Sequence, residues 1–322
     1  MEYRRLGKAG VKVSVIGLGT NRFGSVASEA QVKNILDVAL DLGINFIDTA
    51  DIYGKGQSEI TIGKALKGRW DQVVLATKFY METGKGPNDQ GASRYHMMNA
   101  VEASLGRLQS DHIDLYYVHH WDEFTPIEET LRGLDDLVRA GKVRYLGASQ
   151  FAAWQLARAN LLAEVRGWAP FVALQAEYNM FERGVERESL PYCKADGVGF
   201  VPYFPLAGGF LTGKYQRGQP APKGSRGESS TYVQGLMSDP NYAKVEKLEA
   251  WAGERGHNMS ELAHAWLLAQ PAVCSVISGA TKPEQVEANA KSADWQLSVE
   301  DAAEVSAMLA GLQAGDQDLP LK

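Results

Sequence analysis

Four side chains of this 322-residue chain have the types needed to protonate an oxyanion: Asp48, Tyr53, Lys78 and His119. A phenol has an unperturbed pKa of about 10, so Tyr53 would respond readily at neutral pH only beside a cation that stabilises its anion. Lys78 can supply that cation, and Asp48 can neutralise it if both are buried. His119 can donate a hydrogen bond to a substrate oxygen. Together they predict an acid that protonates an oxyanion as a hydride reaches the adjacent carbon.

Each of these residues also has an ordinary structural explanation, such as a strand-end cap, a loop aromatic, a solvated charge or a structural histidine. The functional interpretation depends on a wider pattern, because six successive apolar runs end in polar side chains. These ends are Asp48, Lys78, His119, Ser149 with Gln150, Gln175 and Tyr203. The carboxyl ends of strands in a parallel barrel meet at one mouth, so the pattern predicts that these side chains converge.

The apolar runs alternate with helical stretches, as in repeated βα units. The expected strands are Val15 to Gly19, Asn45 to Asp48, Val73 to Thr77, Ile113 to His119, Val143 to Ser149, Val172 to Gln175, Val198 to Phe204 and Ser275 to Ser278. The expected helices are Glu29 to Leu42, Ser93 to Leu108, Ile127 to Ala140, Trp154 to Arg166, Tyr242 to Arg255 and Ser260 to Ala269. The first seven runs start roughly 30 residues apart, the length of a unit with its crossover, which predicts a parallel sheet.

Two folds contain such units, a closed barrel and a doubly wound open sheet. Gly17-Leu18-Gly19 follows the first run like the start of a dinucleotide-binding fingerprint, but Arg22 replaces its third glycine. Eight units favour the barrel. We predict one α/β domain over residues 1–322, a (β/α)8 TIM barrel. A β-hairpin is expected over Tyr3 to Ser14, and a long clamp loop, Thr212 to Pro240, is expected after the seventh strand, followed by the two late helices.

Composition excludes several classes of protein. With 33 Lys and Arg against 39 Asp and Glu, the net charge is -6, which argues against nucleic acid as a partner. No run approaches the roughly 18 apolar residues that span a bilayer, and the start of the chain lacks the apolar core of a secretory signal. Cys193 and Cys274 are expected to be buried free thiols. These features predict a cytoplasmic protein that does not insert into membranes.

The residues do not support a metal site or a serine nucleophile. His119 and His120 with Asp122 and Glu123 could suggest a metal site, but consecutive residues of an extended strand point to opposite faces, so no metal is expected. Ser149 and Ser278 lack the G-x-S-x-G context of a serine nucleophile.

Several segments between about Tyr3 and Asn289 resemble the aldo-keto reductase superfamily in order and spacing. They are NFIDTADIYGKGQSE, VVLATK, IDLYYVHHWD, GKVRYLGAS, QAEYN, VPYFPLAGGFLTGKY and VISGATKPEQVEAN. Bacterial-type reductases and potassium-channel β-subunit relatives look most similar. The resemblance implies a barrel that binds NADPH without a Rossmann fold and reduces aldehydes or ketones. It also implies that Tyr53 is the general acid, that Lys78 and Asp48 tune it, and that His119 orients the carbonyl.

The resemblance further implies a set of cofactor contacts. They are Thr20, Asn21, Asp48, Ser149, Gln150, Gln175, Tyr203, Phe204, Leu206, Ala207, Gly208, Lys214, Arg226, Gly279, Thr281, Lys282, Gln285 and Asn289. Two departures stand out, since Gln150 occupies a position where Asn is usual and Phe204 one where Ser is common. Lys282, with Arg226 as a helper, is the expected cation for the adenosine 2′-phosphate, which favours NADP(H) over NAD(H).

The substrate is expected to be a small carbonyl compound. Its pocket walls are expected to be Phe23, Tyr53, Tyr80, His119 and Trp121, with the loop Met81 to Ser93. The leading hypothesis is an NADPH-dependent carbonyl reductase, whose reverse reaction would oxidise a sugar or an alcohol. The alternative is an NADP-bound regulatory or redox-sensing subunit with slow turnover. His119 weighs against that alternative, because the channel-subunit branch is expected to carry Asn there.

Overall fold

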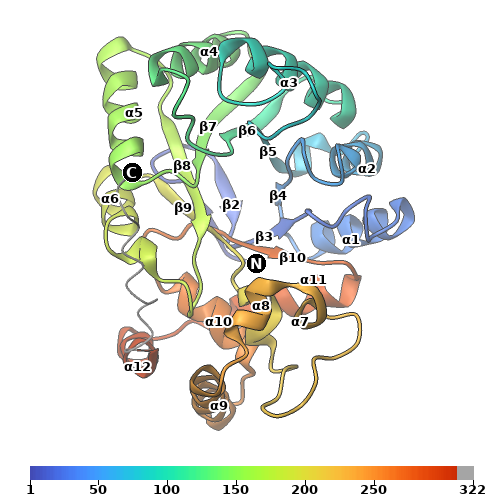
Figure 1. The fold of residues 1–322 in the computed structure, drawn as a ribbon, viewed down its shortest axis with the longest axis vertical. Helices are drawn as coiled ribbons and strands as arrows, with labels where there is room; N and C mark the ends of the chain where they lie inside the picture. The colour runs from blue at the N-terminus through green and yellow to red at the C-terminus, as the bar shows by residue number, and fades with distance from the viewer. Residues whose placement is uncertain (310–322) are drawn as a thin grey trace.

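A computed structural model describes residues 1–309 and shows eight parallel strands ringed by helices (Figure 1). The strands are β3 (Ile16–Gly19), β4 (Phe46–Asp48), β5 (Val74–Phe79), β6 (Ile113–Val118), β7 (Val143–Ser149), β8 (Phe171–Glu177), β9 (Gly199–Tyr203) and β10 (Val276–Gly279). Their order in the sheet is β10-β3-β4-β5-β6-β7-β8-β9. The expected (β/α)8 barrel is confirmed. Residues 310–322, which belong to the expected domain, lie outside the described part.

The last strand closes the barrel on two sides. The β10 strand pairs with β3 in parallel, with Val276 opposite Ile16. Just before β10, the Phe200 amide donates to the Ala272 carbonyl at 2.8 Å, and the Cys274 amide donates to the Phe200 carbonyl at 3.0 Å. These bonds join the end of the chain to both β3 and β9.

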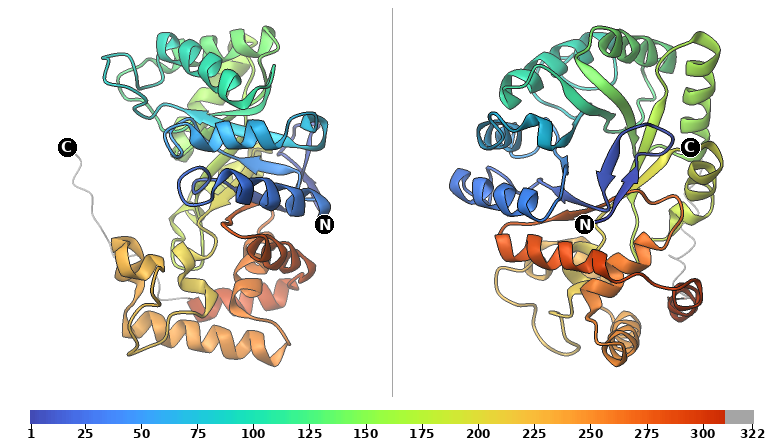
Figure 2. Two further views of the ribbon diagram at one scale, coloured as in Figure 1. Left: turned by 90° about the vertical axis from the view of Figure 1, so that its right-hand side faces the viewer. Right: turned by 180° about the vertical axis from the view of Figure 1, so that it is seen from behind.

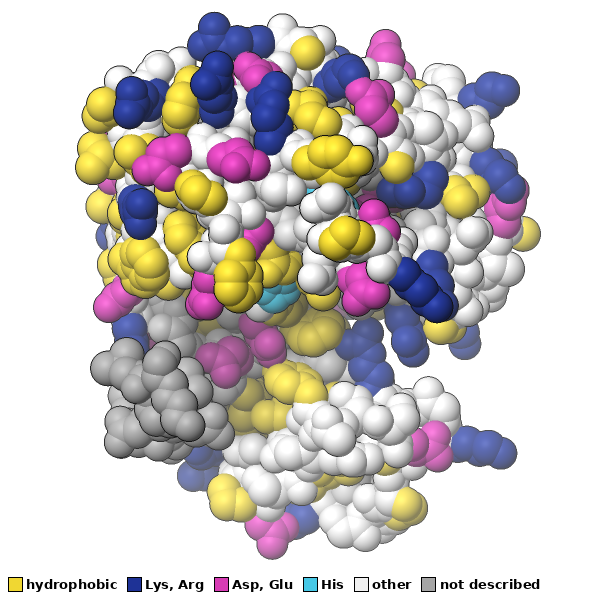
Figure 3. Space-filling view, turned by 45° about the horizontal axis from the view of Figure 1, so that its top comes forward, with side chains coloured by type: hydrophobic (Ala, Val, Ile, Leu, Met, Phe, Trp, Pro, Cys, Tyr) yellow, Lys and Arg dark blue, Asp and Glu magenta, His cyan; other side chains and the backbone are white. Residues whose placement is uncertain are grey.

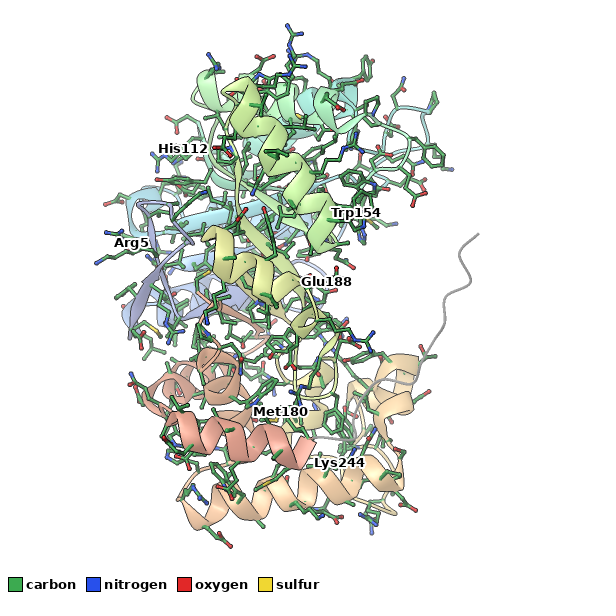
Figure 4. The ribbon with its side chains drawn as sticks, turned by 90° about the vertical axis from the view of Figure 1, so that its left-hand side faces the viewer. Arg5, His112, Trp154, Met180, Glu188 and Lys244 are labelled. Carbon is green, nitrogen blue, oxygen red and sulfur yellow. The ribbon has the colours of Figure 1, made fainter. Side chains whose placement is uncertain are left out.

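Strands β1 (Tyr3–Arg5) and β2 (Lys12–Ser14) form the expected antiparallel hairpin. Leu6 and Val13, from the hairpin, pack with the barrel-interior residues Phe46, Leu115 and Val201. Figure 2 shows the hairpin lying across one end of the barrel when the molecule is seen from behind. In Figure 4, Arg5 and Trp154 lie towards opposite sides of the barrel. The hairpin therefore covers the amino end of the strands and leaves the carboxyl end open.

Helices surround the sheet. They are α1 (Glu29–Asp41), α2 (Gln57–Ala65), α3 (Arg94–Leu108), α4 (Ile127–Arg139), α5 (Ala153–Arg166), α6 (Ser189–Asp196), α7 (Arg226–Ser229), α8 (Thr231–Leu236), α9 (Asp239–Glu254), α10 (Met259–Leu268), α11 (Pro283–Lys291) and α12 (Val299–Leu309). Side-chain caps fix several starts. Ser28 accepts from the Gln31 amide at the start of α1, and Asn258 accepts from the Glu261 amide at the start of α10. None of the helices within residues 1–309 combines the length and the apolar character that crossing a membrane requires.

The clamp segment, residues 212–240, differs from the continuous loop that was expected. It contains the short helices α7 and α8, and α9 begins within its last residues. Ser230 caps α8 by accepting from the Val233 amide, and Pro240 stands in the first turn of α9, where a missing amide proton costs nothing. Glycine and proline content alone therefore overstated how irregular this segment is.

Candidate active site

A cavity of about 560 Å³ opens at the carboxyl ends of the strands. Its walls come from most of the strand ends and from the clamp segment. Figure 3 shows a hollow in the molecular surface between the upper and lower parts of the view. The lining residues include Thr20, Asn21, Arg22, Asp48, Tyr53, His119, Ser149, Gln150, Gln175, Tyr203, Phe204, Leu206, Gly208, Lys214, Arg226, Gly279, Thr281 and Gln285. The polar strand ends thus meet at one mouth.

A buried ion pair lies at the bottom of this cavity. The Lys78 Nζ donates to Asp48 Oδ2 at 2.7 Å and to the Thr49 carbonyl at 2.7 Å, and Lys78 is completely buried. The Gln175 side-chain amide donates to Asp48 Oδ1 at 2.8 Å. Burial is the largest single influence and by itself would lower the pKa of Lys78, but Asp48 and Tyr53 together outweigh it and raise that pKa. The lysine is therefore held as an ammonium ion.

Tyr53 lies against this ammonium ion. Its hydroxyl is 3.4 Å from Lys78 Nζ, and the same nitrogen is 5.0 Å from the centre of the Tyr53 ring. Burial raises the pKa of Tyr53, and Lys78 offsets only part of that effect. The sequence led us to expect the cation to dominate, whereas desolvation does. Tyr53 therefore holds its proton at neutral pH, in the state that an acid needs.

His119 completes the group from the end of β6. Its ring packs edge-on against Tyr53, with 6.2 Å between ring centroids, and its buried Nδ1 has no hydrogen-bond partner within residues 1–309. Burial lowers the pKa of His119 to about 2, and the charges of Lys78 and His120 add to the effect. A neutral imidazole has one donor and one acceptor nitrogen, so His119 can bond a substrate oxygen without carrying charge.

His119 and His120 do not point to opposite faces, although the sequence had predicted that they would. The rings of His119 and His120 are stacked with 5.5 Å between centroids, because β6 ends at Val118 and strand alternation no longer applies to them. Asp122 is engaged elsewhere and accepts from the Ala92 amide at 2.7 Å. Within residues 1–309, no three His, Cys, Asp or Glu side chains are grouped to hold a metal ion.

The cavity also fits a large phosphate-bearing cofactor. Arg226 stacks over Phe204 at 5.4 Å, and within the described chain neither Arg226 nor Arg22 forms an ion pair with a carboxylate. Gly208, with φ of 66°, lies so close to α8 that a Cβ there would be 2.7 Å from Val233. Arg22 and Arg226 are therefore available to bind anionic oxygens, and Gly208 allows the clamp segment to pack closely against this wall of the cavity.

Comparison with known proteins identifies the family of this chain. The sequence model of the Aldo/keto reductase family matches residues 15–310. The chain belongs to the aldo/keto reductase family.

Relatives of this aldo/keto reductase carry different names. It is 38% identical over 302 residues to a probable voltage-gated potassium channel subunit beta of Arabidopsis thaliana, covering 91% of this chain and 92% of that protein. It is 38% identical over 312 residues to the uncharacterized oxidoreductase YrpG of Bacillus subtilis, covering 93% of each. It is 35% identical over 314 residues to versiconal hemiacetal acetate reductase of Aspergillus parasiticus, covering 89% of this chain and 91% of that protein.

Most of the cofactor contacts expected for this aldo/keto reductase line the cavity, but three do not. Ala207 is buried beneath it, Lys282 is exposed at the residue that precedes α11, and Asn289 is buried farther along that helix. Gln150 lines the cavity, yet its amide nitrogen lies 3.1 Å from His120 Nε2. Gln150 also has φ of 56°, a conformation that Asn adopts more easily.

Only some of the residues that were expected to form the substrate pocket line the cavity. Tyr53 and His119 line the cavity, whereas Phe23 is fully buried in the hydrophobic core and forms no part of its wall. Tyr80 is half-buried with its ring 5.6 Å from His120, and Trp121 packs edge-on against Phe151. These two lie beside the mouth, outside the lining.

Sequence reasoning missed Arg22 as a site residue and used it only as evidence against a Rossmann fingerprint. It lines the cavity opposite the clamp segment. Burial and the charge of Arg22 together lower the pKa of Arg226, and both residues line the cavity. The sequence did contain a signal for this role, because Arg22 is a cation that directly follows Thr20 and Asn21, the polar residues after the first expected strand.

Proposed function

We propose that this protein is an NADPH-dependent reductase of aldehyde or ketone carbonyls. The observation that carries the proposal is the contact of the Tyr53 hydroxyl with the buried Lys78 and Asp48 pair, with His119 beside it, at an open cavity. A relative named as a reductase and one named as an oxidoreductase support this reaction class. We further propose that residues 1–322 act as one cytoplasmic domain on a small-molecule substrate.

When bound, a nicotinamide cofactor supplies a hydride to the carbonyl carbon. Tyr53 donates its proton to the carbonyl oxygen, and Lys78, held by Asp48, stabilises the phenolate that remains. His119 hydrogen-bonds the same oxygen in its neutral form. Gln175 already donates to Asp48, but its side-chain carbonyl is free to accept from a carboxamide. Tyr203 supplies an aromatic face at the end of β9.

Steady-state turnover tests the proposal directly. We expect a generic aldehyde to be reduced with NADPH over many turnovers, with kcat at or above about 1 s⁻¹, and NADH to be less effective. The potassium-channel name of the Arabidopsis relative favours the alternative of a regulatory, redox-sensing subunit. That alternative would be supported by turnover far below about 1 s⁻¹ with every aldehyde tested. A panel of aldehydes, ketones and sugars would then define the substrate.

Arg226 should contribute to the preference for NADPH. Replacing it with Leu is expected to weaken NADPH binding by about 10- to 100-fold, because a charge-assisted hydrogen bond contributes roughly 1.5–3 kcal/mol. NADH lacks the 2′-phosphate, so its affinity should change little. Fluorescence titration with both cofactors measures the effect.

Arg217→Leu is the matched control, since Arg217 lies in the same segment but pairs with Glu246 at 3.0 Å. An equal loss of NADPH and NADH affinity in Arg226→Leu would assign Arg226 to the shared pyrophosphate and contradict its role at the 2′-phosphate.

A further inference from the structure

Two tryptophans lie beside the cavity and have no role in the proposed mechanism. Trp121 follows His119 and His120 in the loop after β6, and Trp154 stands in the first turn of α5. Their rings meet edge-on with 5.7 Å between centroids. Trp154 is 57% exposed, and it lies on the side of the barrel away from the hairpin, where the strands have their carboxyl ends (Figure 4). Contiguous exposed apolar rings of this size mark a surface that binds something.

The two rings are held in place by the core beneath them. Trp121 also packs edge-on against Phe151 with 5.3 Å between centroids, and Phe151 packs against the fully buried Phe171 at 5.7 Å. Asp122, the next residue in the loop, accepts from the Phe124 amide at 2.9 Å and so fixes the backbone beside Trp121. The surface is therefore formed before any ligand arrives, which lowers the entropy that binding costs.

The tryptophan pair is continuous with the candidate active site. His119 and Gln150 line the cavity, and both contact His120. The His119 and His120 rings stack with 5.5 Å between centroids, and the Gln150 amide nitrogen lies 3.1 Å from His120 Nε2. Trp121 follows His120 directly in the chain. A substrate whose carbonyl oxygen bonds to Tyr53 and His119 thus needs a sizeable ring system to reach past His120 to the tryptophans.

The chemistry around the pair favours an aromatic ring as its occupant. Indole rings bind other aromatic rings edge-on or offset-stacked. A sugar also stacks on tryptophan but needs hydrogen-bond partners around its ring, and the neighbouring polar groups are already engaged. Asp122 accepts from the Ala92 amide at 2.7 Å, and His120 Nε2 lies against Gln150. Two rings are also far smaller than the roughly 1,000 Å² that a stable protein interface requires.

We propose that Trp121 and Trp154 form an aromatic shelf that binds the ring system of an aromatic aldehyde or ketone while its carbonyl group lies at Tyr53 and His119. This inference rests on the proposed function and adds a substrate class to it. The shelf is remote from the reacting carbonyl, so it stabilises the bound substrate and the transition state equally. Such binding lowers KM and leaves kcat nearly unchanged.

Replacing Trp121 with Ala should raise KM for 2-naphthaldehyde about 3- to 10-fold, because one aromatic contact stabilises a complex to about that degree. The kcat for this substrate should stay within about twofold. Propionaldehyde is too short to reach the shelf, so its KM should not change. Trp154→Ala should act in the same direction without opening the core, since its ring is exposed. Trp121→Phe should keep most of the affinity for 2-naphthaldehyde.

Leu161→Ala is the matched control, because Leu161 is 61% exposed on the same helix but about two turns farther from the mouth. It should leave KM unchanged for both aldehydes. An unchanged KM for 2-naphthaldehyde in Trp121→Ala would overturn the inference, and so would equal increases for 2-naphthaldehyde and propionaldehyde. A larger increase for a sugar aldehyde than for 2-naphthaldehyde would contradict the choice of an aromatic ring.

Two further measurements do not depend on turnover. In calorimetry with 2-naphthamide, an analogue that cannot be reduced, Trp121→Ala should bind about 3- to 10-fold more weakly than wild type, with or without NADPH. Equal binding by the two proteins, or none by wild type, would refute the shelf. The expected difference in binding without any aldehyde reduction would contradict the proposed function instead. Sedimentation velocity should give the same oligomeric state for Trp154→Ala and wild type. Dissociation of an oligomer with KM unchanged would make the shelf a subunit interface and refute the inference.

Discussion

Replacing Tyr53 with Phe should reduce kcat for aldehyde reduction by a factor of about 10² to 10⁴ while NADPH affinity stays within about twofold. The substitution removes one hydroxyl, which within residues 1–309 is the only group in contact with Lys78 Nζ that can pass a proton into the cavity. The ring remains and can keep its edge-on packing against His119. Stopped-flow or steady-state rates, with cofactor binding followed by fluorescence, measure the two quantities separately.

Tyr80→Phe is the matched control, because Tyr80 is a half-buried tyrosine beside the same mouth but outside the cavity lining. It should leave kcat nearly unchanged. Full turnover by Tyr53→Phe would contradict the assignment of Tyr53 as the acid. Loss of NADPH binding in that variant would mean that the hydroxyl holds the cofactor.

Replacing Lys78 with Met should reduce both activity and stability. Turnover should fall by about 10² or more, since nothing then stabilises the Tyr53 phenolate. Stability should fall by about 3–5 kcal/mol at neutral pH, because the almost fully buried Asp48 carboxylate loses its cation and keeps only the hydrogen bond from Gln175. Denaturant unfolding measures the loss.

The double variant Lys78→Met, Asp48→Asn separates the two effects. Removing the second charge should recover part of the lost stability, since an uncharged pair leaves no buried ion. Activity should remain absent, because the cation is still missing. If the double variant were no more stable than Lys78→Met, the destabilisation would come from packing and the electrostatic explanation would be wrong.

Much of the fold could be predicted because βα alternation is a strong sequence signal. All eight strands were expected within a few residues, and Gly19, Asp48 and Ser149 end their strands as predicted. Helix α2 was missed because its buried face carries Ser58, Glu59 and Thr61, which hide the apolar spacing of a typical amphipathic helix.

The placement of individual side chains was harder to predict. Phe23 follows a strand end like a pocket residue, but the turn after β3 directs it into the core. Lys282, which the family resemblance implies at the 2′-phosphate, is exposed and not part of the cavity lining, whereas Arg22, which was not expected at the site, lines the cavity. Local sequence gives a residue's type and approximate position. Its direction depends on packing between elements that are distant in the chain.

The pairing of β3 with β10 has a consequence for how the protein is made. It joins Ile16 to Val276, so one wall of the cavity comes from the beginning of the chain and its neighbour from near the end. Contacts between such distant residues carry a large loop-closure entropy and form slowly. During synthesis, the growing chain can build seven barrel strands on the ribosome while Gly19 still lacks Gly279 beside it. The cavity at the strand ends is therefore among the last features to assemble, because its walls are incomplete until β10 has left the exit tunnel.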